Sequence, residues 1–431
     1  MRPTHRGITL VMLDPEPAPA PVYRQPLPRD AVGISALYDE AYRPADGGDP
    51  RDHYPFPQLL EPDWVAKEVR EPSICWIVAE LGGAVVGSAA AVRNIGVEGD
   101  RVAEVFGIVV RQDAQGLGIG AALLAHLDAA LGDDAAVVLC ESRTGDIRGW
   151  KIARRCGFQP IGFEPFAHTT PVGSESMLPT ARIRPFALSR RSAARPATTN
   201  ARALADLVAG ASAAPPLDGQ PTLQVIIDDA LIRVRRDDRE GERLLHAWRD
   251  RPRRWAGVVN LRRFEGENLG RQRYDGRYYV AGTNGQDLGS IRVVWDHTDR
   301  RARVLDLQSE SVEVGATLIE SAVADLRAEA SGGPLVIALD VRADAPLLQT
   351  RLDALGFLPT AYYPALLADG PSRVDAVQFT QFDARPLDRS LDLLGGLDWP
   401  SAALVVGRVV ASGHRRERKH RVPLGDPDSP C

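Results

Sequence analysis

Three glycines stand at alternate positions in a short loop, at 116, 118 and 120, with Gln115 immediately before them. The β-rich run that precedes the loop ends at Val110, and a helical run follows it. Glycine has no Cβ, so the backbone can come close to a ligand, and the first N–H groups of a helix have no partner within it. Those groups also carry a partial positive charge. The spacing therefore predicts a loop that binds a pyrophosphate.

The elements on either side of this loop are predicted by their periodicity. Leucines at 123, 124, 127 and 131 recur at helical spacing and predict one buried helix face. Upstream, residues 74–80 and 84–92 are β-rich runs joined by Gly82-Gly83, which predicts a hairpin. The glycine spacing is not that of the dinucleotide-binding fingerprint, whose third glycine follows the second by three residues.

The pattern Gln115-x-x-Gly118-x-Gly120 resembles the acetyl-coenzyme A signature of the GNAT superfamily of N-acetyltransferases. A strand at 135–141, a second helical segment and Gly157-Phe158 follow in the order that the family shows. The resemblance covers residues 26–182. It implies an α/β (α+β) fold with a mixed, mostly antiparallel central sheet flanked by helices. It also implies acetyl-CoA as the donor and transfer of an acetyl or other short acyl group to an amine by direct attack.

The resemblance further implies which residues bind the donor. The strand before the loop should diverge from its neighbour, so that its backbone meets the pantetheine and the acetyl carbonyl. Asp146 stands where the family often has an asparagine that contacts the cofactor, and it could also cap the following helix. The implied donor-binding residues are thus Ile108, Val109, Val110, Gln115, Gly116, Leu117, Gly118, Ile119, Gly120 and Asp146.

Two glutamates are candidates for the general base, which must make the attacking amine neutral. Glu104 lies at the start of the strand before the loop, where many family members place a carboxylate that acts directly or through water. The alternative is a solvated carboxylate at a strand end. Glu141, at the end of the next strand, is the second candidate, although its counterpart in the repeat described below, Asp340, favours a structural role.

The general acid is where the sequence departs from the family pattern. Many members carry a tyrosine four residues before the glycine of the Gly-Phe pair, and here that residue is Ala153. Cys156 is near, but a residue directly before Gly-Phe usually points into the core. Three alternatives stay open: a tyrosine from elsewhere such as Tyr54, protonation of the leaving thiolate by solvent, or lost activity.

The acceptor side is predicted from a Pro-rich aromatic segment at 52–64, between the first two helices, the region that lines the acceptor site in this fold. Tyr54, Phe56 and Trp64 are the predicted substrate contacts, and packing against the helices is the alternative for these side chains. His168, near the final strands, is interpreted as structural.

Comparison of the two halves of the chain reveals an internal repeat. Residues 136–143 match 335–342, and residues 156–165 match 355–364. Opposite the glycine loop, however, the second half has Glu310-Ser-Val-Glu-Val-Gly315, which retains only the last glycine. Glu310 and Glu313 would repel a pyrophosphate. The sequence predicts two acetyltransferase-type folds in tandem, the second a degenerate copy that does not bind coenzyme A.

Length and composition limit the remaining possibilities. A chain of 431 residues exceeds one ordinary core, and a net charge of −5 gives no general attraction to nucleic acid. The four cysteines have no paired spacing, and no segment is long and apolar enough for a signal peptide or a membrane span, which favours the cytoplasm. We expect no metal site and a monomer or homodimer that acts on a small-molecule or protein amine.

The predicted organisation has five parts. A Pro-rich leader (1–25), an N-terminal acetyltransferase domain (26–188), a linker with a helical stretch (189–221), a degenerate C-terminal domain (222–412) and a basic tail (413–431) follow one another. Two rival functions remain: a non-catalytic acyl-CoA-binding or regulatory module, favoured by Ala153, and a scaffold in which both halves are inert. The intact glycines argue against the scaffold.

Overall fold

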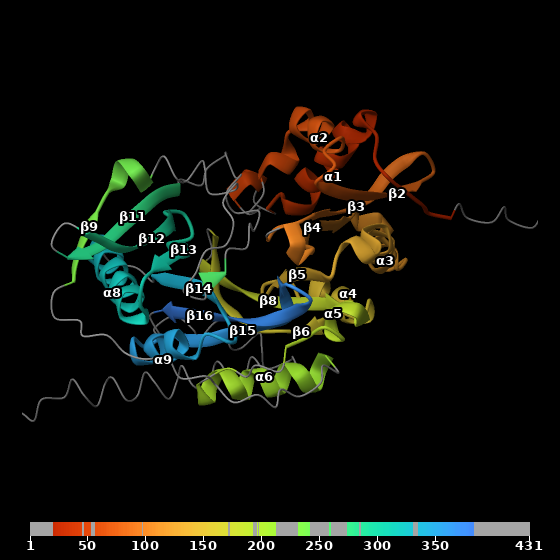
Figure 1. Cartoon of the computed structure of the whole chain (residues 1–431). Coiled ribbons are helices and arrows are strands. Elements are labelled where there is room, and N and C mark those ends of the chain that lie inside the picture. Colours follow the sequence, from red (N-terminus) through yellow and green to blue (C-terminus); the bar gives the residue numbers. More distant parts are fainter. Residues whose placement is uncertain are drawn as a thin grey trace, which may run out of the picture.

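The computed structural model describes residues 20–44, 47–52, 57–96, 98–170, 173–192, 196, 198–212, 232–241, 258–259, 274–283, 286–330 and 335–382. Within these residues the chain forms two mixed sheets, each with helices packed against it (Figure 1). Of the residues discussed above, Tyr54, Phe56, most of the leader and the basic tail lie outside the described residues.

The first sheet has the strand order β1-β2-β3-β4-β5-β8-β6, with β7 paired to β8. Among the described strands of this sheet, β4 and β5 run parallel to each other and the other neighbours are antiparallel. The predicted hairpin and the mixed sheet are therefore confirmed. The strands are β1 (Val22–Arg24), β2 (Ile74–Leu81), β3 (Ala84–Val92), β4 (Val102–Val110), β5 (Val137–Arg143), β6 (Gln159–Pro160), β7 (Glu164–Thr170) and β8 (Gly173–Ile183).

Helices cover both faces of the first sheet. On one face α1 (Ala31–Tyr42) and α2 (Pro62–Glu68) pack against Trp76, Val78 and Phe106. On the other face lies α3 (Ile119–Leu131), and all four leucines of its predicted face are buried there. Next along the chain, α4 (Arg148–Arg155) contacts α3 and β5, and α5 (Pro185–Leu188) follows β8.

The second sheet repeats this order from its opposite end, as β15-β16-β14-β13-β12-β11-β9, with β10 paired to β14. The parallel pair is now β13 and β14. Its elements are β9 (Arg233–Arg236), β10 (Val258–Val259), β11 (Tyr274–Thr283), β12 (Gln286–Asp296), β13 (Arg301–Ser309), α8 (Val312–Glu329), β14 (Val336–Arg342), α9 (Pro346–Ala354), β15 (Leu358–Asp369) and β16 (Ser372–Phe382).

The repeat extends to unusual backbone conformations. Arg101 has φ 53° and its counterpart Arg300 has φ 51°, although an arginine rarely adopts the left-handed region. Gly157 and Gly356 share φ values of 82° and 84° at the same offset along the chain. Phe166 and its counterpart Ala365 both have φ 51° although their residue types differ, so the two halves share local conformations beyond the matching residues.

The two halves are joined by direct backbone hydrogen bonds at a seam between residues 161–163, which follow β6, and β15. Gly162 forms a bridge with Ala361, which is its own counterpart in the repeat. The N–H of Phe163 donates to the carbonyl of Thr360, and the N–H of Tyr362 donates to that of Ile161, both at 2.7 Å. Each bond is the counterpart of the other, so the halves meet about an approximate two-fold axis, as subunits of a symmetric dimer do.

A second reciprocal contact lies on either side of this axis. Asp100 of the first half accepts a hydrogen bond from the N–H of Ala368 at 2.7 Å. Its counterpart Asp299 accepts one from the N–H of Thr169 at 2.6 Å. Each carboxylate thus holds a strand of the other half. The symmetry ends at His168, whose Nδ1 lies 3.2 Å from Asp299 Oδ2.

We expect the His168–Asp299 pair to make docking of the halves depend on pH. Burial alone would lower the pKa of His168, but the hydrogen bond and charge of Asp299 outweigh burial and the nearby Arg143 and Arg301, so the pKa is raised. A raised pKa stabilises the folded state below the ordinary value and loses this contribution as pH rises through the raised value. The variant His168→Gln should therefore lower the melting temperature, relative to wild type, by more at pH 6 than at pH 9. Equal differences at both values would contradict this.

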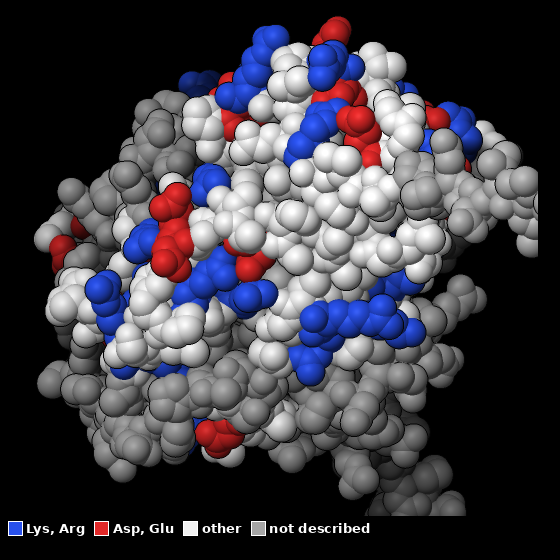
Figure 2. Space-filling view, turned by 90° about the vertical axis from the view of Figure 1, so that its right-hand side faces the viewer, with Lys and Arg blue, Asp and Glu red and all other residues white. Residues whose placement is uncertain are grey.

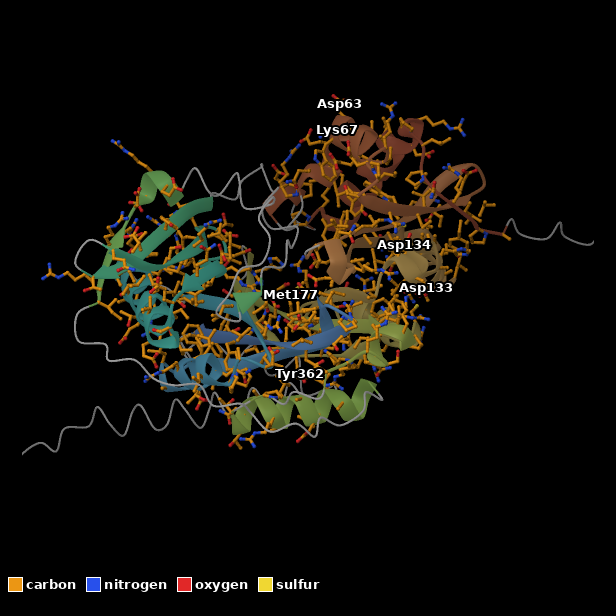
Figure 3. All side chains as sticks on the ribbon, in the orientation of Figure 1. Asp63, Lys67, Asp133, Asp134, Met177 and Tyr362 are labelled. Atoms are coloured by element: carbon orange, nitrogen blue, oxygen red, sulfur yellow. The ribbon has the colours of Figure 1, made fainter. Side chains whose placement is uncertain are left out.

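Part of the predicted linker is packed between the halves. The helix α6 (Thr199–Ser212) contacts β6 of the first sheet and β15 of the second. Before it, the guanidinium of Arg191 forms an ion pair with Asp375 at 2.7 Å, and both side chains are about 1% exposed. The hydroxyl of Tyr362, labelled in Figure 3, donates to the same carboxylate. Arg191 and α6 therefore help to hold the halves together.

None of the helices in the described ranges combines the length and apolar character that a membrane crossing requires.

Candidate functional site

The strand β4 is bent by a bulge shortly before the glycine loop. Its register with β3 shifts between Ser88 and Ala90, and Gly107 lies there with φ 63°, a conformation that glycine adopts without steric cost. The hydroxyl of Tyr38, on α1, donates to the Gly107 carbonyl and lies 3.2 Å from Ser88 Oγ. The bulge is thus fixed by a buried side chain from the helix above it.

The parallel strands β4 and β5 diverge at the same level. Their last paired residues are Val105 and Cys140, although both strands continue toward their C-terminal ends. The divergence implied by the family resemblance is therefore confirmed. It places Ile108, Val109 and Val110 on a strand that has left its parallel neighbour.

The glycines of the loop have two separate structural functions. Gly116 and Gly118 have φ values of 84° and 79°, and a Cβ on either would meet no atom within 4 Å. Gly118 is the N-cap of α3. A Cβ on Gly120, by contrast, would lie 2.8 Å from Ile152 of α4. Two glycines therefore shape an open loop, and the third allows α3 and α4 to pack closely.

The first residue of the loop is tied to the start of α4. Gln115 donates from Nε2 to the Val110 carbonyl at 3.0 Å and accepts at Oε1 from Nη1 of Arg148 at 3.0 Å. Asp146 accepts from the backbone N–H of Arg148, the first residue of α4, at 3.0 Å, although the N-cap itself is Ile147. Burial alone would raise the pKa of Asp146, but hydrogen bonds from Arg148 lower it.

The two candidate bases lie on one face of the first sheet. Glu104 is in register with Leu139 of β5, and Glu141 follows two residues later on the same strand. Glu104 is about 8% exposed, and both carboxylates contribute by their charge to the raised pKa of Cys140, about 12, whose largest cause is burial. The carboxylates are thus gathered around the point where β4 and β5 separate.

The second half gives an independent view of these positions. The counterparts of Glu104 and Glu141 are Arg303 and Asp340, whose Nη1 and Oδ2 atoms are 3.4 Å apart. In the second half, side chains at these two positions are therefore close enough to form an ion pair.

The family tyrosine position holds no side chain that could donate a proton, because residue 153 is an alanine. Ala153 is also fully buried. Cys156 donates from Sγ to the Ala121 carbonyl at 3.3 Å, and burial raises the pKa of its thiol. Tyr42, the last residue of α1, is affected by the charges of Arg143, Asp146 and Arg148, and burial raises its pKa to about 12. The sequence analysis did not consider Tyr42, which lies one helical turn after Tyr38 on α1.

The predicted acceptor residues are only partly described. Trp64 lies in α2 rather than in a loop, and it packs against the apolar cluster between α1, α2 and the sheet. This supports the packing alternative for this side chain. The outer face of the same helix carries Asp63 and Lys67, which lie at the edge of the molecule away from the second half (Figure 3).

The counterpart of the glycine loop is missing from the second half. Residues 111–118 separate β4 from α3, whereas only residues 310–311 separate β13 from α8. Ser311 caps α8 by accepting from the N–H of Val314 at 3.1 Å. Glu313 is buried in the first turn, 3.4 Å from Arg351. The expectation that both Glu310 and Glu313 repel a pyrophosphate is therefore corrected for Glu313, which is buried in α8, and the loop that would hold the pyrophosphate is replaced by helix.

The gap between the parallel strands of the second half is also filled. The last paired residues of β13 and β14 are Arg303 and Ala338. Beyond them, Val258 and Val259 of β10 pair with β14 at Val341 and Asp340, and β10 also contacts β13. A segment of the chain itself thus occupies the position that lies between the diverging strands.

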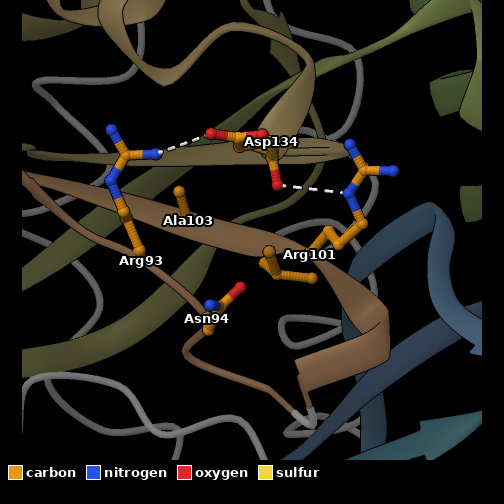
Figure 4. A pocket seen from close by; sticks show the side chains of 7 residues that line it. Arg93, Asn94, Arg101, Ala103 and Asp134 are labelled. Atoms are coloured by element: carbon orange, nitrogen blue, oxygen red, sulfur yellow. Dashed lines mark hydrogen bonds and ion pairs between the residues drawn. The ribbon is translucent and has the colours of Figure 1, made fainter. Parts of the chain in front are cut away.

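A pocket of about 370 Å³ opens at the opposite end of β4 from the glycine loop (Figure 4). The guanidinium groups of Arg93 and Arg101 lie on its two sides. Nε of Arg101 donates to the Asp134 carbonyl at 3.2 Å, and Arg93 lies 3.7 Å from the Asp134 carboxylate. This pocket is separate from the candidate donor site.

On the side of the molecule that carries α3, charges of neither sign dominate the surface. Figure 2 shows Lys and Arg in several groups, with acidic side chains beside some of them and uncharged surface between them. Within the described ranges, no group of three or more His, Cys, Asp or Glu side chains could hold a metal ion.

Comparison with known protein families agrees with this geometry. Residues 34–158 match the model of the acetyltransferase (GNAT) family. No curated protein matches the chain.

Solved structures similar to the chain include several acetyltransferases, each covering 38% of this chain. One is the ribosomal-protein-alanine N-acetyltransferase from Brucella melitensis, at 23% identity, 99% of its own length and a TM-score of 0.31. The ribosomal-protein-S18-alanine N-acetyltransferase from Escherichia coli shares 18% identity over 94% of its length, with a TM-score of 0.29. A GNAT-family acetyltransferase from Streptococcus pneumoniae shares 14% over 100%, with a TM-score of 0.33.

Proposed function

We propose that the GNAT-family domain at residues 34–158 transfers an acetyl or other short acyl group from acetyl-CoA to an amine. The observation that carries the proposal is the position of the glycine loop. Gly116 and Gly118 adopt left-handed conformations directly before α3, at the end of a strand that diverges from its parallel neighbour. An open loop with N–H groups at a helix N-terminus suits a pyrophosphate.

The proposed roles of the chain follow from this placement. When bound, acetyl-CoA supplies an activated thioester. The loop from Gln115 to Gly120 would hold its pyrophosphate, and backbone groups of residues 108–110 would orient the pantetheine and the acetyl carbonyl. Glu104, gathered with Glu141 at the divergence, would take the proton from the attacking amine.

The second half would be structural. It lacks the loop, and β10 lies beside β14 where the strands diverge. We therefore propose one acetyl-CoA site per chain, in a cytoplasmic monomer or homodimer that uses a small-molecule or protein amine. The alternative is a non-catalytic acyl-CoA-binding or regulatory module, and the buried Ala153 at the family tyrosine position favours it.

Gly118→Asp is expected to abolish acetyl-CoA binding, because it places a negative charge beside the pyrophosphate. Gly118→Asn is the matched control, since asparagine meets the same left-handed φ of 79° without a charge. Asparagine should weaken binding by roughly tenfold or less, the cost of about 1 kcal/mol of backbone strain. Calorimetry with acetyl-CoA measures both.

A stoichiometry of two equivalent sites per chain would contradict the structural role of the second half. Equal acetyl-CoA affinity of the aspartate and asparagine variants would show that the loop does not bind the pyrophosphate. Turnover is tested separately with a panel of primary amines, and wild-type protein that binds acetyl-CoA but acetylates none of them would favour the non-catalytic module.

A further inference from the structure

Arg148 lies across the entrance between the glycine loop and α4. Its Nη1 donates to Oε1 of Gln115, the first residue of the loop, at 3.0 Å. Its Nε lies 2.9 Å and its Nη2 2.7 Å from Oδ2 of Asp146. The side chain is 68% exposed. A guanidinium is thus held beside the loop at a position that solvent, and therefore a ligand, can reach.

The contact with Asp146 fixes the direction of this guanidinium. Arginine and carboxylate form a two-point contact that restricts the plane of the guanidinium group. The same carboxylate accepts from the backbone N–H of Arg148 and so is itself anchored to the start of α4. Asp146 therefore holds Arg148 at both its backbone and its side chain.

The second half of the chain serves as an internal comparison. It keeps Arg342 at the position of Arg143, so this arginine does not depend on the glycine loop. In contrast, the counterparts of Asp146 and Arg148 are Ala345 and Leu347, and the N-cap Ala345 makes no side-chain contact at the start of α9. The Asp–Arg pair is absent from the half that has no glycine loop, and this points to a shared ligand.

We propose that Arg148 binds the pyrophosphate of coenzyme A and that Asp146 is its positioning residue. The proposal rests on the proposed function and adds to it a residue outside the glycine loop. On binding, Nη1 of Arg148 would exchange the amide oxygen of Gln115 for a phosphate oxygen, a stronger acceptor because it is charged. Asp146 would then act on the donor through Arg148 rather than by touching it.

Calorimetry with coenzyme A itself tests the proposal without any need for turnover. Arg148→Met should weaken binding by about 5- to 20-fold, the effect of one charge-assisted contact at an exposed position. The weakening of affinity by added salt should also be smaller in the variant. With 3′-dephospho-coenzyme A the loss should be the same, because this ligand retains the pyrophosphate.

Three further results would overturn the proposal. If Arg148 only neutralises Asp146, the loss caused by Arg148→Met should disappear in an Asp146→Asn background; we expect a loss that is smaller but persists, because Asp146 positions Arg148 and does not bind the ligand. A loss seen with coenzyme A but not with the dephospho ligand would assign Arg148 to the 3′-phosphate instead. Binding within twofold of wild type would exclude a direct contact, whereas a wild-type protein that binds no coenzyme A would refute the proposed function itself.

Discussion

Glu104→Gln is expected to lower kcat at neutral pH by about 10²–10⁴-fold, the usual contribution of a positioned general base. The loss should shrink as pH rises, because more of the amine is then already neutral. Affinity for acetyl-CoA should not change, since Glu104 lies on the strand face opposite Ala103 and Val105, which pack against α3. The measurement is kcat from pH 6 to 9 with an amine identified from the panel.

Glu141→Gln is the matched control, because it removes the same charge from the facing position on β5. A smaller loss with little pH dependence is expected for it. If Glu104→Gln and wild type have equal kcat across this pH range, Glu104 is not the general base, and Glu141 or water takes the proton instead.

A fragment that ends at Arg190 should be poorly soluble or unfolded, although it contains the whole donor site. It would leave Glu164, about 1% exposed in the full chain, without Arg301, which lies 2.7 Å away. The fragment would also expose apolar side chains, Ile161 among them, that share one buried cluster with residues of the second half. Each large apolar side chain that loses its burial costs about 1.5–3 kcal/mol, out of a typical folding free energy of about 5–15 kcal/mol. Yield of soluble protein and thermal unfolding measure the effect.

Co-expression with residues 191–431 should restore solubility and acetyl-CoA binding. A complementing fragment that begins at residue 215 is the sharper control, because it lacks α6 and the Arg191–Asp375 pair and should restore less. Cleavage within 213–220 of the intact chain should do little harm. A stable N-terminal fragment with full affinity for acetyl-CoA would show that the second half has its own task.

The parts of the site that the sequence predicted are those set by local geometry. Left-handed glycines before a helix and leucines at helical spacing depend on neighbours in the sequence, and both were found where predicted. The tandem sheets followed from the repeat, because matching residues impose matching local structure. These features need no knowledge of which segments meet in space.

Contacts between distant segments were not predictable in this way. The approach of Arg148 to Gln115 depends on how α4 packs on α3, and the sequence analysis assigned Arg148 no role. The insertion of β10 beside β14 joins residues with no shared pattern. Nor did the polar character of residues 189–200 indicate that Arg191 would be buried against Asp375.

The bridge between Gly162 and Ala361 has a consequence for how such a chain can evolve. A Cβ on Gly162 would lie 2.4 Å from the Cα and Cβ of Ala361, so alanine fits on one side of the axis only. In a homodimer both subunits have the same sequence, so a residue on the two-fold axis contacts the identical residue of the other subunit and must fit against it. Once both copies share one chain, each side can mutate alone. The bridge between Gly162 and Ala361 joins two different residues at equivalent positions, and His168 has Leu367 as its counterpart. A homodimer of identical chains could contain neither difference.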